Sequence, residues 1–484
     1  MIIRVYVGAL ALLGSLMALL APCLLTASES KIAMFRSNPK HTGVYDSPAI
    51  KIGNLKWRFK TGGKVRSSPA VVGGIVCFGS EDGYLYGLSA NKGQLLWKFK
   101  TVGEVSSSPA AADDIVYFLG GDGAFYALEL KTGQQQWKYQ AGRDLPFEAM
   151  KGDPRTWDYF SSSPTVTNDR AFFGSGDGNL YALNRKTGKL TWKFRTEGRI
   201  RSSPAVDGGV VFVGSFDRQF YAIDSQTGNL KWRIQVGGPI QSSPAVGDGL
   251  VYFGARDGFL HAVDSQTGQE VWKADHQGSW VVTSPAVAQG MVFAGSSDGE
   301  FVQALDARTG VEQWRFKTGG NVFSSPAVVG EALYFGAFNV RLYALDIQHG
   351  KLQAVNVAES AINSSPVLVD GVLYVGSDDN CLYAFEGDAL RMRKDLALDP
   401  SILDAYVGEY EISPGVVITI SRDDSHLMAQ VTGQMKIHLS ADSETEFYFS
   451  EGGVEMRFLK DDKGVVTAMK IEQGGQLSTI KKSK

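Results

Sequence analysis

The chain has few cysteines, few histidines and no excess of basic residues, and each shortage excludes a class of protein. Its 3 cysteines, Cys23, Cys77 and Cys381, are too few for a disulfide framework in 484 residues. Cys77 and Cys381 fall in different positions of the repeat described below, and we expect two buried thiols rather than a bridge. The 6 histidines show no metal-ligand spacing, so the sequence predicts no metal site.

The charge balance argues against nucleic-acid binding. Lys and Arg total 48 against 51 Asp and Glu, so the chain has no basic field with which to displace the counterions of a phosphate backbone. Its 56 glycines, set among many Val, Tyr, Phe and Ser residues, are typical of short strands joined by tight turns. Together with the length, this composition favours one large β-repeat array with an appendage.

The N-terminus carries an apolar leader. Residues 5–25 contain no charge and follow Arg4, a pattern that predicts an export signal and a location in the periplasm or cell envelope. Three fates remain open: cleavage near Ala27, retention as a membrane anchor, since the run is about long enough to span a bilayer, or lipidation at Cys23. The last is suggested by the run LAPC, which resembles a lipoprotein acylation site except that Pro22 stands where a small residue is usual.

A motif close to SSPAV recurs eight times and defines the repeat. Successive prolines are 40 or 41 residues apart, except for one gap of 55 that indicates an insertion. Each unit predicts four antiparallel strands, with turns at an Asp-Gly and a Thr-Gly step. Eight four-stranded units predict an all-β, eight-bladed propeller. The prolines are Pro69, Pro109, Pro164, Pro204, Pro244, Pro285, Pro326 and Pro366.

The ring is expected to close with a strand from the other end of the array. The eighth unit stops after residues 382–385 without a fourth strand, whereas residues 55–59 form an orphan fourth strand ahead of the first unit. Pairing the two removes both open sheet edges. The predicted domains are a leader at 1–27, a lead-in at 28–49, the propeller at 50–387, a linker at 388–399 and a small β domain at 400–484.

A tryptophan recurs in the fourth strand and lapses only at Ala354. Burying about 200 Å² of aromatic surface at about 25 cal/mol per Å² contributes about 5 kcal/mol at most. We therefore interpret the series as a structural staple between blades rather than as a ligand platform. Its members are Trp57, Trp97, Trp137, Trp192, Trp232, Trp272 and Trp314.

The strings YALNRKTGKLTW (181–192) and YAIDSQTGNLKW (221–232) resemble the tryptophan-docking repeat of pyrroloquinoline-quinone (PQQ)-type propellers. That family includes quinoprotein alcohol dehydrogenases and the propeller lipoprotein of outer-membrane protein assembly, so the resemblance implies a fold but no single function. The dehydrogenases resemble one another in a vicinal disulfide and in a calcium ion held by Glu, Asn and Asp oxygens. No two cysteines adjoin here and no matching calcium motif is found, so we predict neither PQQ nor Ca²⁺.

The tail from Pro400 changes to short alternating runs, which predict a small β-barrel or meander. Its opening, LDAYVGEYE (403–411), is similar to the lipocalin-like module appended to many serine β-lactamase-like hydrolases, a resemblance that implies an accessory or binding role. Gly295–Gly299 fits a nucleophile elbow by its letters, but that motif must join a strand to a helix, and here the repeat places it in a hairpin. The sequence therefore predicts no catalytic residue.

Variable positions inside a rigid repeat are candidates for recognition. The position three residues before each proline should line the mouth of the central channel, and the inserted segment 141–160 and Trp280 should lie on the same face. We expect either a binding rim or a cap that only plugs the channel. The slot holds Arg66, Ser106, Ser161, Arg201, Gln241, Val282, Phe323 and Asn363. The candidate rim residues are Arg66, Arg201, Gln241, Phe323, Asn363, Arg155, Trp157, Asp158, Tyr159 and Trp280.

These features favour a monomeric, non-catalytic binding or scaffold protein of the cell envelope, although they leave catalysis open. Its partner would be an envelope protein, a small molecule or a glycan. One alternative is an enzyme-related role, either as a diverged quinoprotein oxidoreductase or as an accessory subunit of an envelope hydrolase. Another is an extracytoplasmic sensor of solutes or polysaccharides.

Overall fold

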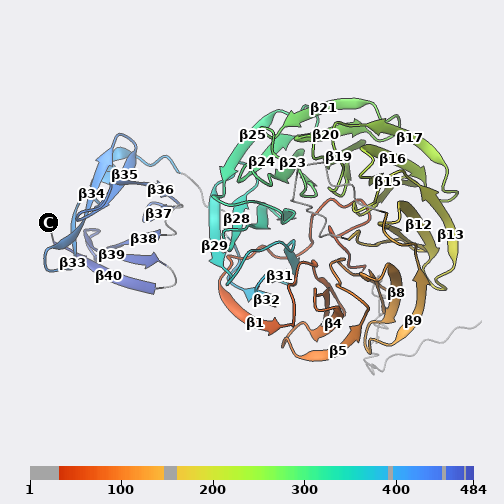
Figure 1. Ribbon diagram of the computed structural model, residues 1–484. Helices are drawn as coiled ribbons and strands as arrows, with labels where there is room; N and C mark the ends of the chain where they lie inside the picture. Colours follow the sequence, from red (N-terminus) through yellow and green to blue (C-terminus); the bar gives the residue numbers. More distant parts are fainter. Residues whose placement is uncertain (1–31, 146–160, 391–395, 450–453, 474–475, 484) are drawn as a thin grey trace, which may run out of the picture.

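The computed structural model describes residues 32–145, 161–390, 396–449, 454–473 and 476–483. These residues form eight four-stranded antiparallel sheets arranged as a ring, and a closed barrel beside it (Figure 1). The predicted all-β fold with an eight-bladed propeller is confirmed. The leader, with its candidate acylation site Cys23, lies outside the described residues.

Each blade is a meander whose short first strand lines the channel and whose fourth strand lies outermost. Blade 1 has β2 (Ala70–Val72), β3 (Ile75–Gly79), β4 (Tyr84–Ser89) and β5 (Leu95–Lys100). Blade 2 has β6 (Ala110–Ala112), β7 (Ile115–Leu119), β8 (Ala124–Glu129) and β9 (Gln135–Gln140). Blade 3 has β10 (Thr165–Val166), β11 (Arg170–Gly174), β12 (Asn179–Asn184) and β13 (Leu190–Arg195). Blade 4 has β14 (Ala205–Asp207), β15 (Val210–Gly214), β16 (Gln219–Asp224) and β17 (Leu230–Gln235).

The second half of the ring repeats this order. Blade 5 has β18 (Ala245–Gly247), β19 (Leu250–Gly254), β20 (Phe259–Asp264) and β21 (Glu270–Asp275). Blade 6 has β22 (Ala286–Ala288), β23 (Met291–Gly295), β24 (Phe301–Asp306) and β25 (Glu312–Lys317). Blade 7 has β26 (Ala327–Val329), β27 (Ala332–Gly336), β28 (Arg341–Asp346) and β29 (Leu352–Val357). Blade 8 has β30 (Val367–Val369), β31 (Val372–Gly376), β32 (Cys381–Glu386) and, as its outer strand, β1 (Asn54–Lys60).

The closing strand pairs as predicted. β1 runs antiparallel to β32, with Trp57 opposite Ala384 and Lys60 opposite Cys381. Residues from the two ends of the array thereby complete one sheet, which leaves no open seam in the ring. Cys77 and Cys381 are separate buried thiols.

The recurring Asp-Gly step builds the turn between the second and third strands. In blade 1 the Asp82 carboxylate accepts the Tyr84 amide at 3.1 Å and the Tyr86 hydroxyl at 2.7 Å, while Gly83 adopts φ +83°, which favours glycine. The Asp–Tyr contact recurs in blades 2, 3, 4 and 8. The carboxylate thus fixes both the turn and the third strand that follows it.

Each recurring tryptophan lies between two blades. Its Nε1 donates to a backbone carbonyl of the next blade, as from Trp97 to Leu130 at 2.8 Å and from Trp314 to Ile347 at 2.8 Å. Its ring lies flat on the Thr-Gly turn of that blade: a Cβ added to Gly133 would lie 2.6 Å from the Trp97 ring. This position requires glycine for both its space and its φ of +70°. The other five tryptophans donate in the same way.

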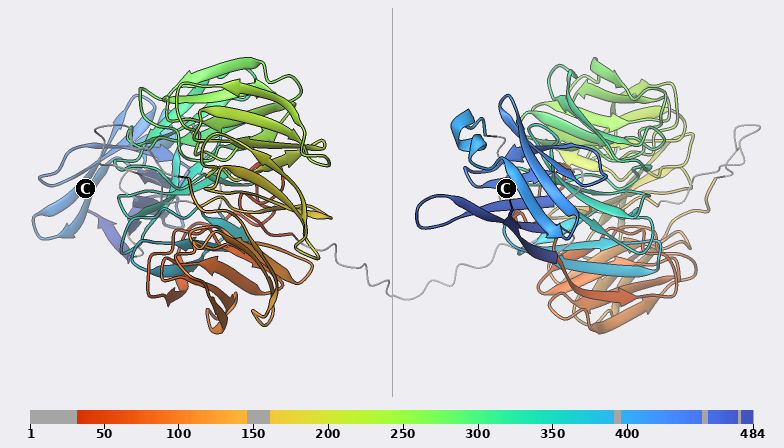
Figure 2. Two further views of the ribbon diagram at one scale, coloured as in Figure 1. Left: turned by 45° about the vertical axis from the view of Figure 1, so that its right-hand side comes forward. Right: turned by 90° about the vertical axis from the view of Figure 1, so that its left-hand side faces the viewer.

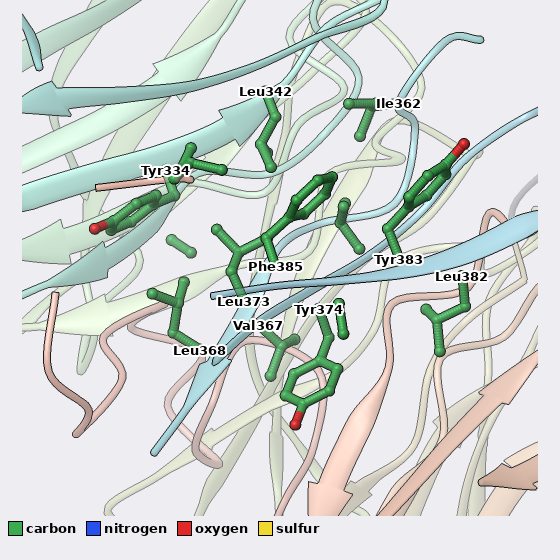
Figure 3. Packing of buried hydrophobic residues seen from close by; sticks show 14 of the residues in the cluster. Tyr334, Leu342, Ile362, Val367, Leu368, Leu373, Tyr374, Leu382, Tyr383 and Phe385 are labelled. Carbon is green, nitrogen blue, oxygen red and sulfur yellow. The ribbon is translucent and has the colours of Figure 1, made fainter. Parts of the chain in front are cut away.

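The seam between blades 7 and 8 lacks its tryptophan and is filled from the N-terminal side. Ala354 stands in the tryptophan position, and Ile50 and Ile52 are buried in the same cluster. The Tyr334 hydroxyl donates to the Ile50 carbonyl at 2.7 Å, whereas the equivalent Tyr252 donates to the next blade. Figure 3 shows Tyr334 among the packed side chains of this cluster. The chain just before β1 therefore substitutes for the missing ring.

The lead-in segment crosses the face of the propeller opposite the Asp-Gly turns. Inner-strand amides of Ala111, Val206, Val246, Val287 and Val328 donate to lead-in carbonyls between residues 33 and 43, at 2.7 to 2.9 Å. Innermost strands have an unpaired edge toward the channel, and these hydrogen bonds satisfy part of it.

Two polar lead-in side chains are buried where the segment crosses the channel. Arg36 is 1% exposed and donates to the carbonyls of Pro285 and Pro326. His41 is 0% exposed and lies 2.9 Å from the Thr165 hydroxyl. The lead-in thus covers one mouth of the channel.

The C-terminal domain is a closed antiparallel barrel of β33 to β40, capped by the short helix α1 (Pro400–Asp404). Its interior is filled by apolar side chains, among them Tyr406 stacked on Phe458 with ring centroids 4.4 Å apart. The strands are β33 (Gly408–Ser413), β34 (Val416–Asp423), β35 (His426–Val431), β36 (Ile437–Ala441), β37 (Glu446–Phe449), β38 (Val454–Lys460), β39 (Val466–Gln473) and β40 (Gln476–Lys482).

The barrel lies at the side of the ring, next to blade 7, and does not extend over either mouth of the channel (Figures 1 and 2). Lys51 reaches it through an ion pair to Glu455 at 2.6 Å. In the described part of the chain, no helix has the length and apolar character that a membrane span requires.

Candidate functional site

The channel narrows to a cavity of about 70 Å³ beneath the loop-side mouth. All eight positions three residues before the repeat prolines line this cavity, so the rigid repeat brings the variable slot together at one place. Arg66, Arg201, Gln241, Phe323 and Asn363 are among them. Arg155, Trp157, Asp158 and Tyr159 lie outside the described residues.

Below this slot a ring of serines encircles the channel. The serine just before each proline donates its amide to the hydroxyl oxygen of the corresponding serine in the next blade, at 2.9 to 3.1 Å. Eight such hydrogen bonds close on themselves, from Ser68 through all blades and back from Ser365. The second serine of SSPAV is thus the innermost contact between blades.

One half of the mouth is charged and internally paired. Arg66 donates from Nε and Nη2 to both Asp378 oxygens, at 3.0 and 2.8 Å, and its Nη1 lies 3.2 Å from Glu81. Asn363 also donates to Asp378, at 3.0 Å, and the Lys64 ammonium lies 3.2 Å from it. A bidentate arginine–carboxylate pair is a strong, oriented contact.

The charges around this pair shift two acids in opposite directions. Burial alone would raise the pKa of Asp378, but hydrogen bonds and charge from Arg66 hold that pKa below its ordinary value. For Glu81, burial outweighs the attraction of Arg66 and raises the pKa. The charged side chains in this half of the mouth are therefore held in place by one another.

Arg201 anchors the start of the inserted segment. Its Nη2 donates to Asp144 at 2.6 Å, while the neighbouring Arg199 donates to the Leu145 carbonyl at 2.7 Å. The Leu145 amide in turn donates to the carbonyl oxygen of Gly176, in blade 3, at 2.8 Å. Because the Arg66 and Arg201 side chains are only 12% and 10% exposed, substituting either would disturb the propeller as well as its rim.

The other half of the mouth, at blades 4 to 7, is aromatic. The Arg256 guanidinium lies 4.8 Å from the Trp280 ring centroid and 5.1 Å from that of Phe216, a cation–π arrangement. It also donates to the Gln241 amide oxygen. On blade 7 the rings of Phe323 and Phe338 have centroids 5.0 Å apart. All four rings are partly exposed.

Sequence reasoning missed two further variable slots at this mouth. The residue between Ser and Asp in the Asp-Gly turn donates its amide to the residue five before the repeat proline, as from Phe216 to Arg199 and from Ser297 to Trp280. Both slots vary within the repeat, which is the signal that could have revealed them. The turn slot holds Glu81, Gly121, Gly176, Phe216, Arg256, Ser297, Phe338 and Asp378.

The described mouth does not fit PQQ. A cavity of about 70 Å³ is far below the roughly 300 Å³ and more that sites for organic ligands of this size occupy. The two arginines that line it are already engaged with Asp378 and Asp144. Among the described residues no group of His, Cys, Asp and Glu could hold a metal ion.

Two buried histidines make stability depend on pH. Burial, reinforced by the charge of Arg36, lowers the pKa of His41 to about 3, and burial with Arg315 does the same for His276. An unfolded histidine titrates near 6.5. Between these values the unfolded chain binds protons that the folded chain excludes, so stability falls as pH falls.

We therefore expect His41→Gln to remove part of this acid sensitivity. Lowering the pH from 6.5 to 4.5 should reduce the free energy of unfolding by about 2–3 kcal/mol for each buried histidine. The His41→Gln variant has one buried histidine fewer, so its free energy of unfolding should fall by that much less. Urea unfolding at both pH values measures the difference. His349→Gln is the control. The His349 side chain is 74% exposed, so this variant should lose as much free energy of unfolding on acidification as the wild type does. Equal acid losses in both variants would contradict the assignment.

Repeated four-stranded blades, tryptophans docked between them and a strand-closed ring define a PQQ-type repeat propeller. The chain belongs to the family described as outer membrane protein assembly factor BamB, whose model matches residues 49–154, 147–242 and 232–386. A second family model, described as a domain of unknown function, matches residues 393–481.

Solved structures resemble the propeller at low sequence identity, which shows the fold alone. BamB from Moraxella catarrhalis is 18% identical with a TM-score of 0.57, over 69% of this chain and 99% of its own. Quinohemoprotein alcohol dehydrogenase from Comamonas testosteroni is 14% identical with a TM-score of 0.61, over 77% of this chain and 84% of its own.

A curated relative resembles a much shorter stretch. Penicillin-binding protein 4* from Bacillus subtilis is 25% identical over 89 residues, which is 18% of this chain and 20% of that protein. The chain therefore spans about a fifth of the length of this relative.

Proposed function

We propose that this protein is a non-catalytic binding protein of the cell envelope that holds a protein partner on the loop-side rim of its propeller. The observation that carries the proposal is the convergence of variable slots into one mouth with an aromatic half and an ionic half. The opposite mouth is covered by the lead-in. Membership of a family described as an assembly factor and the apolar leader support an envelope location.

The chemistry of the rim favours a macromolecule over a small solute. Aromatic residues and arginine are enriched at the centres of protein interfaces, where they contribute most of the binding energy. The cavity of about 70 Å³ has no room for a sugar ring. This argues against a solute sensor in the channel.

A double substitution in the aromatic half tests the proposal. Trp280→Ala with Phe323→Ala should lower the yield of partner cross-linked in envelope extracts roughly tenfold or more, as expected when interface anchors are lost. The melting temperature should change by less than about 2 °C, because both rings are partly exposed. The readout is quantitative mass spectrometry of the cross-linked product.

The control pair for that experiment is Leu230→Ala with Val311→Ala, two apolar residues exposed by 43% and 59% on the outer side of blades 4 and 6. It should leave the yield unchanged. An equal loss with both pairs, or a melting temperature that falls with the yield, would refute the rim as the binding surface.

The alternative that the sequence leaves open is a diverged quinoprotein oxidoreductase, although the fold shared with quinohemoprotein alcohol dehydrogenase carries no function by itself. That candidate requires stoichiometric binding of PQQ in the presence of Ca²⁺, visible as quinone absorbance that remains with the protein after gel filtration. The binding-protein proposal expects none. Bound quinone at one equivalent per chain would favour the oxidoreductase.

The match to penicillin-binding protein 4* supports a third candidate, an accessory subunit of an envelope hydrolase. The mass spectrum of the cross-linked product distinguishes it, because a hydrolase would then be the principal partner. Its capture should depend on the C-terminal barrel rather than on Trp280 and Phe323.

A further inference from the structure

Among the described outer strands, β29 of blade 7 alone carries no charged residue. In the other seven blades the residue after the tryptophan is Lys or Arg, on a strand that pairs only on its inner side. A cation there discourages another chain from pairing with the edge, because pairing would bury its charge. Blade 7 instead has Val355 and, two residues further on, Val357, which are 37% and 59% exposed. The seven cations are Arg58, Lys98, Lys138, Lys193, Arg233, Lys273 and Arg315.

β29 also keeps backbone hydrogen-bonding groups on its outer side. The Ala358 amide donates to the Val340 carbonyl at 2.8 Å, and positions along an antiparallel pair alternate between hydrogen-bonded and non-hydrogen-bonded. Val355 and Val357 therefore direct their N–H and C=O groups away from β28. The Val357 amide donates to the side-chain oxygen of Asn356 at 2.7 Å. No described strand pairs with the outer edge of β29, so the backbone there can accept one more strand.

This edge lines a groove between blade 7 and the C-terminal barrel (Figure 1). The groove has a volume of about 2050 Å³, well above the roughly 300–1,000 Å³ of small-molecule sites. Val355 and Val357 line it from the propeller, and Met435, which is 87% exposed, lines it from the barrel. The 6 residues of β29 extend over roughly 20 Å. The groove therefore suits an extended polypeptide better than a compact ligand.

The unpaired charge beside this edge is mainly positive. Arg341 lies opposite Val357, Lys317 ends β25 of blade 6, and Lys436 comes directly before β36 of the barrel. All three line the groove, are exposed and have no anionic partner among the described residues. Four acids also line it, but three of them lie 2.6 to 4.0 Å from a lysine. Complementary charge therefore favours an acidic segment.

We propose that the groove binds an extended acidic segment of a partner protein, which adds to β29 as a fifth strand of blade 7. The segment pairs with the backbone of Val355, and one of its carbonyls replaces the Asn356 side chain at the Val357 amide. Its carboxylates lie near Arg341 and Lys436. The groove is at the side of the propeller, apart from the loop-side rim, so this proposal does not rest on the proposed function.

A synthetic peptide tests the groove. The probe is a fluorescein-labelled octapeptide of alternating Val and Glu with blocked termini, and its fluorescence anisotropy with the full chain measures Kd. It should bind at one site per chain, and raising NaCl from about 50 to about 500 mM should weaken it roughly fivefold or more. The same peptide with Lys in place of Glu should bind roughly tenfold more weakly.

N-methylated peptides test whether the backbone is paired. Two versions of the acidic peptide carry N-methyl groups on alternate residues, one on every Val and the other on every Glu. Only one set of amides faces β29, so one version should lose binding and the other should keep it. Equal binding by both versions would contradict strand addition. This measurement uses the wild-type chain and does not depend on how any variant folds.

A proline substitution tests the same contact from the side of the protein. Val355→Pro removes an N–H that is not part of the blade's own ladder, a position where proline is tolerated, and should weaken the acidic peptide roughly tenfold. The matched control is Arg233→Pro at the equivalent position of β17 in blade 4, which should leave Kd unchanged. The melting temperatures of the two variants should agree within about 2 °C. An equal loss of binding in both variants would overturn the proposal.

A charge substitution tests the preference for an acidic segment. Arg341→Gln with Lys436→Gln should weaken the acidic peptide roughly tenfold, whereas Lys131→Gln with Lys186→Gln, two exposed lysines in turns of blades 2 and 3, should not change its Kd. Equal affinity for the Glu and Lys peptides would overturn the charge assignment. A wild-type chain that is dimeric by light scattering, and monomeric as Val355→Pro, would assign the edge to a second copy instead.

Discussion

A chain that begins at Thr61 should lose cooperative unfolding, because it lacks the outer strand of blade 8. β1 pairs with β32 from Asn54 to Lys60, and it carries Trp57, which donates to Ala90 of blade 1 at 3.0 Å. Without it, blade 8 exposes a sheet edge and the cluster it shares with blades 1 and 7. Calorimetry should show a broad, weak transition, and gel filtration should show association through the open edge.

A matched rescue separates strand pairing from the loss of chain length. Asn54 lies opposite Glu386, so a copy of residues 54–60 inserted after Glu386 through a two-residue Asn-Gly turn can form a hairpin with β32. This variant, which also begins at Thr61, should regain a single cooperative transition. A truncated chain that unfolds like the wild type would refute closure by β1 as the source of cooperativity. A rescue that does not recover would show that the lead-in, which both variants also lack, is required as well.

The blades could be predicted because their determinants are local. The Asp-Gly and Thr-Gly steps require positive φ at the glycine, and the Asp of each step binds backbone amides within three residues, as Asp224 does. Eight copies of the SSPAV-like motif gave the number of blades, and the strand count within the units exposed the missing fourth strand at residue 385. The closing strand followed from counting alone.

The role of the lead-in could not be predicted, because its contacts are long-range and occur once. Arg36 is buried by carbonyls of Pro285 and Pro326, about 250 and 290 residues away, and no repeat marks it. For the same reason the sequence showed at Ala354 only that the tryptophan is missing, and not which residues replace it. The structure shows Ile50 and Ile52 in the space that the ring would fill.

The candidate site was predicted in position but not in chemistry. Free variation three residues before each proline located the channel mouth, because a rigid repeat brings equivalent residues to equivalent places. It could not show that Arg66 is held by Asp378, which comes from a turn 312 residues later. The variation also could not reveal the serine ring, because a serine that recurs in every unit was interpreted as part of the scaffold. Whether the mouth binds a partner remains the prediction stated above.

Trp97→Ala should destabilise the propeller by about 3–5 kcal/mol, the usual cost of truncating a buried tryptophan. Trp97 is 8% exposed, donates to Leu130 at 2.8 Å and lies flat on Gly133. Trp97→Phe keeps most of the ring contact and loses the hydrogen bond, so its cost should be nearer about 1 kcal/mol. Urea unfolding measures the loss of free energy of unfolding in both variants, provided that the m-value is unchanged.

Blade 7 explains why the cost at Trp97 should be high although an alanine is tolerated at residue 354. At Ala354 the lead-in residues Ile50 and Ile52 belong to the cluster that fills the seam, whereas the cluster around Trp97 contains no lead-in residue. Truncation of Trp97 therefore leaves a cavity that no neighbouring segment is placed to fill, and cavities in a close-packed core are costly. A loss below about 1 kcal/mol for Trp97→Ala would show that the blades are held together chiefly by the serine ring and the lead-in.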